Sequence, residues 1–343
     1  MQNTLSIIIP IYNEKKLISK FIDRLYKSFK SINCQFIFVD DGSTDGTTEW
    51  LDENLKLFFK NENYKLIKID KNYGKANAVK KAIDFVEGKF TLLIDSDLEY
   101  DPVDARELYE IAIENESIEV IQGSRYLGGK IQLRKHLLND IAVRVNTLLF
   151  NFLFDQSITD LHTGTKIIKS NFLKKLNLSF SRFGLEIDVN SQIAKHDINI
   201  YEYGIGYIER SKSEGKKITY IDGILSYYFI FMARFIQNDL TTNISILYSF
   251  IFMTYAGTYF GLGLGKIMIT ILFAITGMII GLKRKIIPLT LVFGAIYVGS
   301  LFSKGNGRIF PIVLFFIIAL IYSKKLSGKL KFIKKNALTK FFI

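Results

Sequence analysis

The sequence has little of the residues that form covalent cross-links or zinc sites. Its single cysteine, Cys34, excludes an intramolecular disulfide, and three scattered histidines argue against a zinc site. No motif typical of nucleic-acid-binding proteins is present, so the net charge of +12 points instead to an anionic membrane surface or a phosphorylated substrate. Any bound metal ion is therefore expected on carboxylates.

A signal peptide of the usual form is also lacking at the amino terminus. The first apolar stretch is too short for the hydrophobic core of such a peptide, and it ends at Pro10 and Asn13. We expect this stretch to be a first β-strand that starts in the cytoplasm.

The average composition, 49% hydrophobic and 23% charged, conceals two different parts. Residues 1–222 mix charged and apolar residues as a soluble catalytic domain does, whereas residues 241–323 carry few charges between long apolar runs and predict a membrane domain. Between them, apolar residues at helical spacing over 223–240 fit a core helix or an interfacial amphipathic helix, and the place before the membrane segments favours the second. Lysines crowd into a basic tail over 324–343.

Four apolar segments in the carboxy-terminal part predict about four transmembrane helices, near 244–263, 267–282, 286–302 and 309–322. The loop between the second and third segments reads Lys283-Arg284-Lys285, and the lysine-rich tail follows the fourth. Because positively charged loops stay in the cytoplasm, we expect a multi-pass protein with its catalytic domain on the cytoplasmic side. The membrane helices also offer a surface for a homo-oligomer.

In the amino-terminal part, short β-branched runs alternate with helical stretches. Strands are predicted near residues 5–9, 36–39, 66–69, 90–94 and 120–122, with helices between them such as 15–30 and 75–86. This alternation predicts an α/β domain with a parallel sheet and helices on both faces, where ligands bind beyond the carboxyl ends of the strands.

Polar motifs follow three of these strands. Residues 10–14 (PIYNE) and 39–46 (VDDGSTDG) place carboxylates where they can accept hydrogen bonds from a base and a ribose, although Asp, Gly and Ser also form ordinary turns. Residues 92–99 (LLIDSDLE) are more specific, because a hydrophobic strand there delivers carboxylates one residue apart. Such a pair suits a hard divalent cation beside a diphosphate.

Together with residues 72–75 (NYGK), these segments resemble the nucleotide-sugar domain of family 2 glycosyltransferases. The resemblance continues downstream and covers roughly residues 4–223 in order, through QGSRY (122–126), DLHTGTK (160–166), FGLEID (183–188), YIER (207–210) and EGKKI (214–218). The last segments are similar to the polyprenyl-phosphate branch, the dolichol-phosphate mannose or glucose synthase type.

The resemblance implies a GT-A fold, a Rossmann-like domain that binds a nucleotide sugar together with Mg²⁺ or Mn²⁺. It implies that the nucleotide sugar is held by Pro10, Tyr12, Glu14, Val39, Asp41, Gly74, Lys75 and Asp95. It also implies that the metal is surrounded by Asp95, Asp97 and Glu99. Glu99 stands where the family often has glutamine, and the extra charge should tighten metal binding.

The acceptor implied by the resemblance is a polyisoprenyl phosphate. A lipid monophosphate is largely dianionic at cytoplasmic pH, so it needs cations rather than a strong general base. The candidates are Arg125, Arg134, Arg210, Lys216 and Lys217. In the alternative interpretation each of them is an ordinary solvated surface charge, and the lysine pair binds anionic lipid before the membrane.

Catalytic roles are expected for Asp97, Arg125 and Arg210. Glu186 and Asp188 are further catalytic candidates that either orient sugar hydroxyls and the basic loop or merely favour a helix N-terminus. His162 and Cys34 have no partners at useful spacing and are interpreted as packing or surface residues.

The expected reaction is direct displacement with inversion, in which a UDP- or GDP-linked sugar is transferred to the lipid phosphate; the segments at 72–75 and 214–217 lean towards UDP. A rival is a family 2 enzyme that polymerises sugars or uses another acceptor. Polymerising members usually show a Gln-x-x-Arg-Trp motif. The only tryptophan here, Trp50, lies in the early part of the catalytic domain, which counts against polymerisation. A second rival, a non-catalytic membrane adaptor, should have lost its site carboxylates, yet Asp41, Asp95 and Asp97 are present.

Overall fold

The computed structural model describes residues 4–59, 63–180, 184–211 and 220–235. The predicted membrane domain, the basic tail and the Lys216–Lys217 pair lie outside these residues. All described elements except the end of the last helix belong to one compact unit, Met1–Arg234.

The first half of this unit alternates strands and helices as predicted. The elements are β1 (Leu5–Ile11), α1 (Ile18–Phe29), β2 (Cys34–Asp40), α2 (Thr47–Phe58), β3 (Tyr64–Lys68), α3 (Lys75–Ile83), β4 (Phe90–Leu93), α4 (Pro102–Glu114) and β5 (Val120–Ser124). The five strands confirm the predicted ones to within a few residues. The α1 helix begins three residues later than expected and α3 ends three residues earlier.

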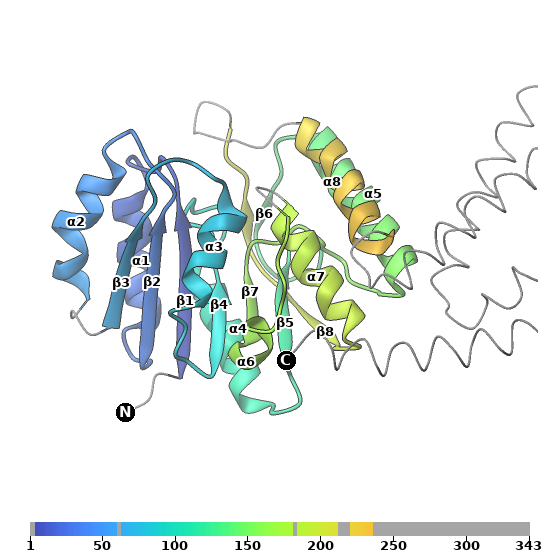
Figure 1. Ribbon diagram of the computed structural model, residues 1–343, viewed down its shortest axis with the longest axis horizontal. Coiled ribbons are helices and arrows are strands. Elements are labelled where there is room, and N and C mark those ends of the chain that lie inside the picture. The colour runs from blue at the N-terminus through green and yellow to red at the C-terminus, as the bar shows by residue number, and fades with distance from the viewer. Residues whose placement is uncertain (1–3, 60–62, 181–183, 212–219, 236–343) are drawn as a thin grey trace, which may run out of the picture. The chain divides into compact units, whose positions relative to one another are not determined.

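The second half holds β6 (Gln132–Leu133), α5 (Leu137–Phe154), β7 (Lys166–Lys169), α6 (Ser170–Leu173), α7 (Leu185–Lys195), β8 (Ile200–Gly204), β9 (Tyr207–Ile208) and α8 (Tyr220–Phe235). The main sheet has the order β3-β2-β1-β4-β7-β5-β8, and β6 pairs with β9 in a separate ribbon (Figure 1). The α8 helix overlaps the predicted interfacial helix.

The prediction of an all-parallel sheet was wrong at one strand. β7 runs antiparallel to both β4 and β5, while the other neighbours in the main sheet are parallel. The reason is connectivity: β7 is reached from α5 through the loop of residues 155–165, which enters the sheet at the edge where the other strands end. This reversal brings that loop beside the carboxyl end of β4.

Both faces of the sheet are covered. Alternate residues of β1 point to opposite sides, so that Ile7 and Ile9 pack with α1, α2 and α4, whereas Ile8 packs with α3, α6 and α7. A third cluster joins α5, α7 and α8 through Phe150, Ile187 and Ile230. These layers leave the carboxyl ends of β1, β2 and β4 facing the α5–α8 side of the domain (Figure 1).

Candidate active site

A cavity of about 690 Å³ opens at the carboxyl ends of the strands, a volume typical of small-molecule sites. Most of the residues predicted to hold the nucleotide sugar line it: Pro10, Tyr12, Glu14, Asp41, Gly74, Lys75 and Asp95. Asp97, Glu99, Arg125, Glu186 and Arg210 line it as well. The structure therefore brings together segments that lie up to about 200 positions apart in the sequence.

Asp41 fixes the segment that follows β3. Its buried carboxylate accepts hydrogen bonds from the backbone N–H groups of Tyr73 (3.1 Å) and Gly74 (2.6 Å). Burial raises the pKa of this carboxyl, although these hydrogen bonds oppose the shift. Gly42 is required next to it, because its φ is +73° and a Cβ there would lie 2.5 Å from the Lys71 carbonyl carbon.

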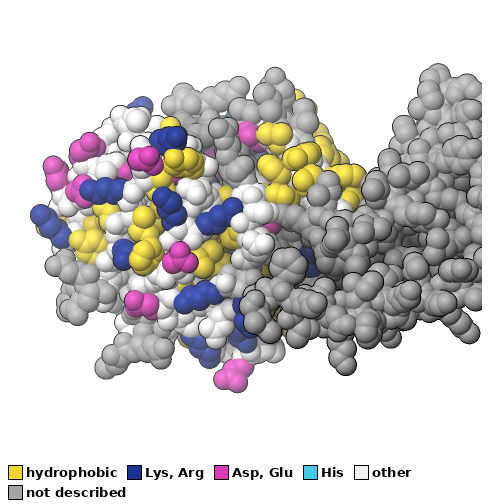
Figure 2. All heavy atoms as spheres, viewed as in Figure 1, with side chains coloured by type: hydrophobic (Ala, Val, Ile, Leu, Met, Phe, Trp, Pro, Cys, Tyr) yellow, Lys and Arg dark blue, Asp and Glu magenta, His cyan; other side chains and the backbone are white. Residues whose placement is uncertain are grey.

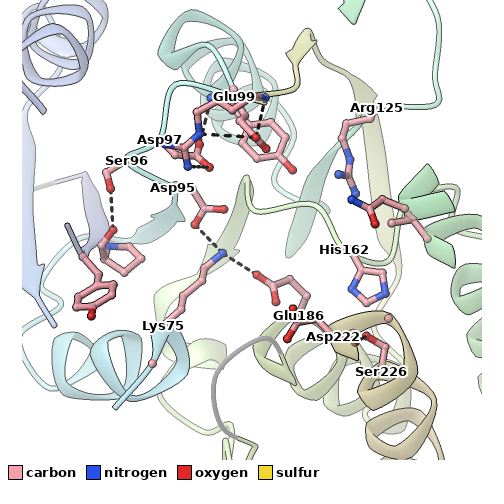
Figure 3. A pocket seen from close by; sticks show the side chains of 18 of the residues that line it. Lys75, Asp95, Ser96, Asp97, Glu99, Arg125, His162, Glu186, Asp222 and Ser226 are labelled. Atoms are coloured by element: carbon pink, nitrogen blue, oxygen red, sulfur yellow. Dashed lines mark hydrogen bonds and ion pairs between the residues drawn. The ribbon is translucent and has the colours of Figure 1, made fainter. Parts of the chain in front are cut away.

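Lys75 connects two carboxylates from distant segments. Its Nζ lies 2.6 Å from Asp95, after β4, and 2.6 Å from Glu186, at the start of α7 (Figure 3). Although burial disfavours its charge, the two carboxylates raise the pKa of Lys75, so the ammonium stays protonated. Glu186 therefore faces the cavity, where Lys75 links it to Asp95.

Arg210 binds the other carboxylates after β4. Its guanidinium lies 3.0 Å from Glu14 and 3.1 Å from Asp97, and its backbone N–H donates to Glu99 at 3.0 Å. Burial and repulsion from Glu99 and Asp95 raise the pKa of Asp97 to about 7, even though Arg210 opposes the shift.

The fit of these carboxylates to a divalent metal can be judged from where they point. Asp95 and Asp97 both line the cavity, and Mg²⁺ or Mn²⁺ can bind through one or two carboxylates when phosphate oxygens and water complete its shell. Glu99 lines the cavity as well, but its carboxylate already accepts hydrogen bonds from the Tyr207 hydroxyl at 3.0 Å and from the Arg210 backbone N–H at 3.0 Å. Within the described residues no group of three Asp, Glu, His or Cys side chains is placed to hold a metal ion. We therefore propose Asp95 and Asp97 as its protein ligands, because the Glu99 carboxylate is occupied by Tyr207 and Arg210.

Arg125 is held by a fully buried carboxylate. Its Nε and Nη2 each donate to Asp160 at 2.7 Å, and its backbone N–H donates to the same carboxylate at 3.1 Å. Burial favours the protonated acid, yet the guanidinium keeps the pKa of Asp160 below its usual range. The pair uses two of the three guanidinium nitrogens, and Nη1 takes no part in it.

Three of the predicted site residues that the structure describes do not line the cavity. Val39 lies in the core beneath it, and Arg134 pairs with Asp140 at 3.1 Å outside it. Asp188 is buried and accepts the backbone N–H groups of Ser179 and Phe180. These two hydrogen bonds favour a structural role for Asp188, because its carboxylate holds the backbone that precedes α7. The remaining pair, Lys216 and Lys217, lies outside the described residues.

No binding or catalytic role was predicted for His162 from the sequence, yet the structure places this residue at the cavity. It lines the cavity together with Asn146 of α5, whose Nδ2 lies 3.3 Å from His162 Nε2. The signal available in the sequence was its position inside the DLHTGTK segment, two residues after Asp160. Cys34 fits the prediction, since it is buried in β2 and burial raises its pKa to about 12.

Comparison with known proteins agrees with this geometry. Residues 6–176 match the model of the family described as glycosyl transferase family 2. The chain is 25% identical over 218 residues to a dolichyl-phosphate beta-glucosyltransferase of Dictyostelium discoideum, covering 60% of this chain and 66% of that protein. It is 27% identical over 219 residues to a dolichol-phosphate mannosyltransferase of Pyrococcus furiosus, covering 62% of this chain and 60% of that protein.

The fold is also similar to that of glucosyl-3-phosphoglycerate synthase from Mycobacterium tuberculosis, solved in complex with uridine diphosphate. The TM-score is 0.52 at 17% identity, over 67% of this chain and 80% of that one. This likeness confirms the GT-A fold, now with a mixed sheet. The chain therefore carries a family 2 glycosyltransferase domain and is a glycosyltransferase.

Proposed function

We propose that the protein transfers a sugar from a nucleotide sugar to a polyisoprenyl phosphate at the cytoplasmic surface of a membrane, with inversion at the anomeric carbon. The observation that carries the proposal is the position of the cavity. One wall is formed by the strand ends that suit a nucleotide, and the opposite wall by α5 and α8, whose outer faces are apolar and exposed.

The donor half rests on the residues around Asp41 and Asp95. The backbone between β3 and α3 is fixed by Asp41, and Tyr12 and Asn72 line the cavity beside it, which leaves room for a base and ribose at the ends of β1 and β2. Asp95 and Asp97 would hold Mg²⁺ or Mn²⁺, whose chemistry is to neutralise the diphosphate leaving group. Solved relatives of this fold contain Mn²⁺ or Mg²⁺ with uridine diphosphate, which supports a metal and a UDP-linked donor.

The acceptor half rests on two arginines. Arg125 is held in place by Asp160, and its remaining nitrogen is available to a phosphate. Arg210 lines the same cavity and pairs there with Glu14 and Asp97. A phosphate held by these cations needs no base, since it is already a nucleophile. Its oxygen forms the bond to the anomeric carbon while the bond from that carbon to the diphosphate oxygen breaks, and the nucleoside diphosphate leaves.

The membrane half rests on α5 and α8. One face of α5 carries a stripe of exposed apolar residues at helical spacing: Leu137, Ile141, Val145, Leu148 and Phe152. On α8, Leu225, Tyr228 and Phe231 are exposed in the same way, and Figure 2 shows apolar side chains gathered over these helices. Of the described helices, α5 alone is long and apolar enough to cross a membrane, but its other face packs in the domain core.

This amphipathic burial favours α5 lying on a bilayer surface rather than spanning it. The apolar segments predicted after residue 240 would then anchor the chain in the same membrane, with the catalytic domain on the cytoplasmic side, and would allow a homo-oligomer. The two curated relatives named above are described as acting on dolichyl or dolichol phosphate, which supports the same acceptor class.

The test is transfer of radiolabelled sugar from a panel of UDP and GDP donors to polyprenyl phosphate in detergent, with extraction of the lipid product. We expect lipid-phase label that disappears with EDTA and falls at least about a hundredfold in Asp97→Ala, because the charge that stabilises the leaving group is lost. Asp52→Ala is a matched control, since Asp52 lies on the surface away from the cavity and pairs with Lys68 there. It should transfer sugar normally.

A parallel reaction replaces the lipid with 3-phosphoglycerate, the acceptor named for the solved relatives of this fold. Label in phosphoglycerate and none in the lipid would show that the acceptor assignment is wrong. Donor binding without transfer to either acceptor would indicate another family 2 acceptor.

A further inference from the structure

Asn146 presents an unsatisfied polar atom at the wall of the cavity. It lies in the middle of α5, is only 1% exposed, and its Oδ1 has no hydrogen-bond partner among the described residues. Its other amide atom, Nδ2, is 3.3 Å from His162 Nε2. Buried polar side chains are almost always paired in folded proteins, so an unpaired one beside a cavity indicates a missing ligand atom.

His162 complements this amide as an uncharged group. Burial and the positive charge of Arg125 lower its pKa to about 4, so the imidazole is neutral at cytoplasmic pH. Its ring also lines the cavity, in the part of Figure 3 that holds Arg125, Glu186 and the start of α8. With Nε2 directed to Asn146, the Nδ1 atom has no hydrogen bond within the described part of the chain.

The pair lies on the acceptor side of the donor carboxylates. The loop that carries His162 passes directly beside Asp95, because a Cβ on Gly164 would lie 2.0 Å from Asp95 Oδ2. Arg125 and His162 lie next to each other in the cavity (Figure 3), so a group that is attached to a diphosphate at Asp95 and Asp97 and points towards Arg125 enters the part of the cavity that the imidazole lines. In a nucleotide sugar that group is the sugar ring.

We propose that Asn146 and His162 form a subsite for a hydroxyl group of the transferred sugar and thereby select the donor sugar. This inference rests on the proposed function. A hydroxyl group donates one hydrogen bond and accepts others, so it satisfies the amide whichever way the amide is turned, and the neutral imidazole too. A dianionic phosphate offers no donor to the unpaired oxygen and binds better to the arginines.

The experiment measures binding of donors to the full-length chain in detergent by titration calorimetry. Free UDP and GDP are compared with UDP-glucose, UDP-galactose, UDP-N-acetylglucosamine and GDP-mannose. In His162→Leu we expect affinity for the preferred nucleotide sugar to fall about tenfold, the size of one hydrogen bond lost in a buried site, while affinity for the free nucleotide changes less than about twofold. Discrimination between epimers should shrink by the same factor.

Asn146→Leu should give the same pattern. The double variant should be little weaker than either single one, because both side chains act on one hydroxyl group. His196→Leu is the matched control and should bind all donors normally. His196 is exposed directly after α7, and it contacts the Gln192 carbonyl and the Phe172 ring rather than the cavity.

Two results would overturn the inference: unchanged discrimination in the folded leucine variants, or an equal loss of affinity for free nucleotide and nucleotide sugar. If leucine at 162 prevents folding, His162→Gln with deoxygenated donors replaces it. The wild type should lose about tenfold affinity when the recognised hydroxyl is removed, and His162→Gln should lose less; an equal ratio contradicts the subsite. Wild-type protein that binds no nucleotide sugar would overturn the proposed function as well.

Discussion

The buried pair between Arg125 and Asp160 gives the sharpest test of how the acceptor side is built. Asp160→Asn preserves the shape of the side chain and an acceptor for the backbone N–H groups, but it removes the charge opposite a guanidinium whose side chain is only 10% exposed. Breaking a buried ion pair in this way costs about 3–5 kcal/mol. For a domain of this size that corresponds to a decrease in Tm of roughly 6–20 °C.

The assay is thermal unfolding of the full-length chain in detergent for wild type, Asp160→Asn, Arg125→Met and the double variant. The double variant leaves no unpaired charge, so its loss should be clearly smaller than the sum of the two single losses. A Tm of Asp160→Asn within about 2 °C of wild type, or strictly additive losses, would refute the reasoning that this pair is a buried charge pair.

Three further predictions follow from single contacts. Burial lowers the pKa of Lys166 to about 7 from a usual value near 10.5, so the unfolded state binds more protons above pH 7 than the folded state does. The free energy of unfolding should therefore rise with pH between about 7 and 9. Thermal scans at several pH values should show that Lys166→Met loses this part of the slope. Gly164→Ala should weaken UDP-sugar binding about tenfold in calorimetry, because the added methyl group displaces the Asp95 carboxylate. An unchanged affinity for the UDP-sugar would contradict the close contact between Gly164 and Asp95. Leu148→Asp with Phe152→Asp should raise the KM for the lipid acceptor at least about tenfold and leave donor affinity unchanged, while an unaltered lipid KM would show that this face of α5 does not meet the membrane.

Local patterns in the sequence predicted the first half of the fold well. The strands up to β5 carry β-branched runs, which predicted their positions. Since parallel strands end at one edge of the sheet, the motifs that follow them were expected to lie together there. The reversal of β7 was beyond such patterns. Its four residues, Lys166–Lys169, contain no mark of direction, and the direction is set by the long connection from α5.

The site divides in the same way. Asp41, Asp95 and Asp97 were predicted as site residues because they follow strands directly. The contact of Lys75 with Glu186 and that of His162 with Asn146 join separate elements instead. The hydrogen bond from Lys75 to Glu186 spans 111 positions, and nothing local in either segment indicates it. For Asp188 the sequence left a catalytic and a structural role open, and its hydrogen bonds from the backbone N–H groups of Ser179 and Phe180 favour the structural one.

The charges around the cavity give a physical reason for a divalent cation. Among the described residues that line it, three are basic and seven are acidic: Glu14, Asp41, Asp95, Asp97, Glu99, Glu186 and Asp222. Lys75 lies between Asp95 and Glu186, and Arg210 pairs with Glu14, Asp97 and Glu99, so these two cations already face five of the carboxylates. A nucleoside diphosphate would add further negative charge to this wall, so its binding requires positive charge that the side chains do not supply, and Asp95 and Asp97 are the carboxylates placed to hold it.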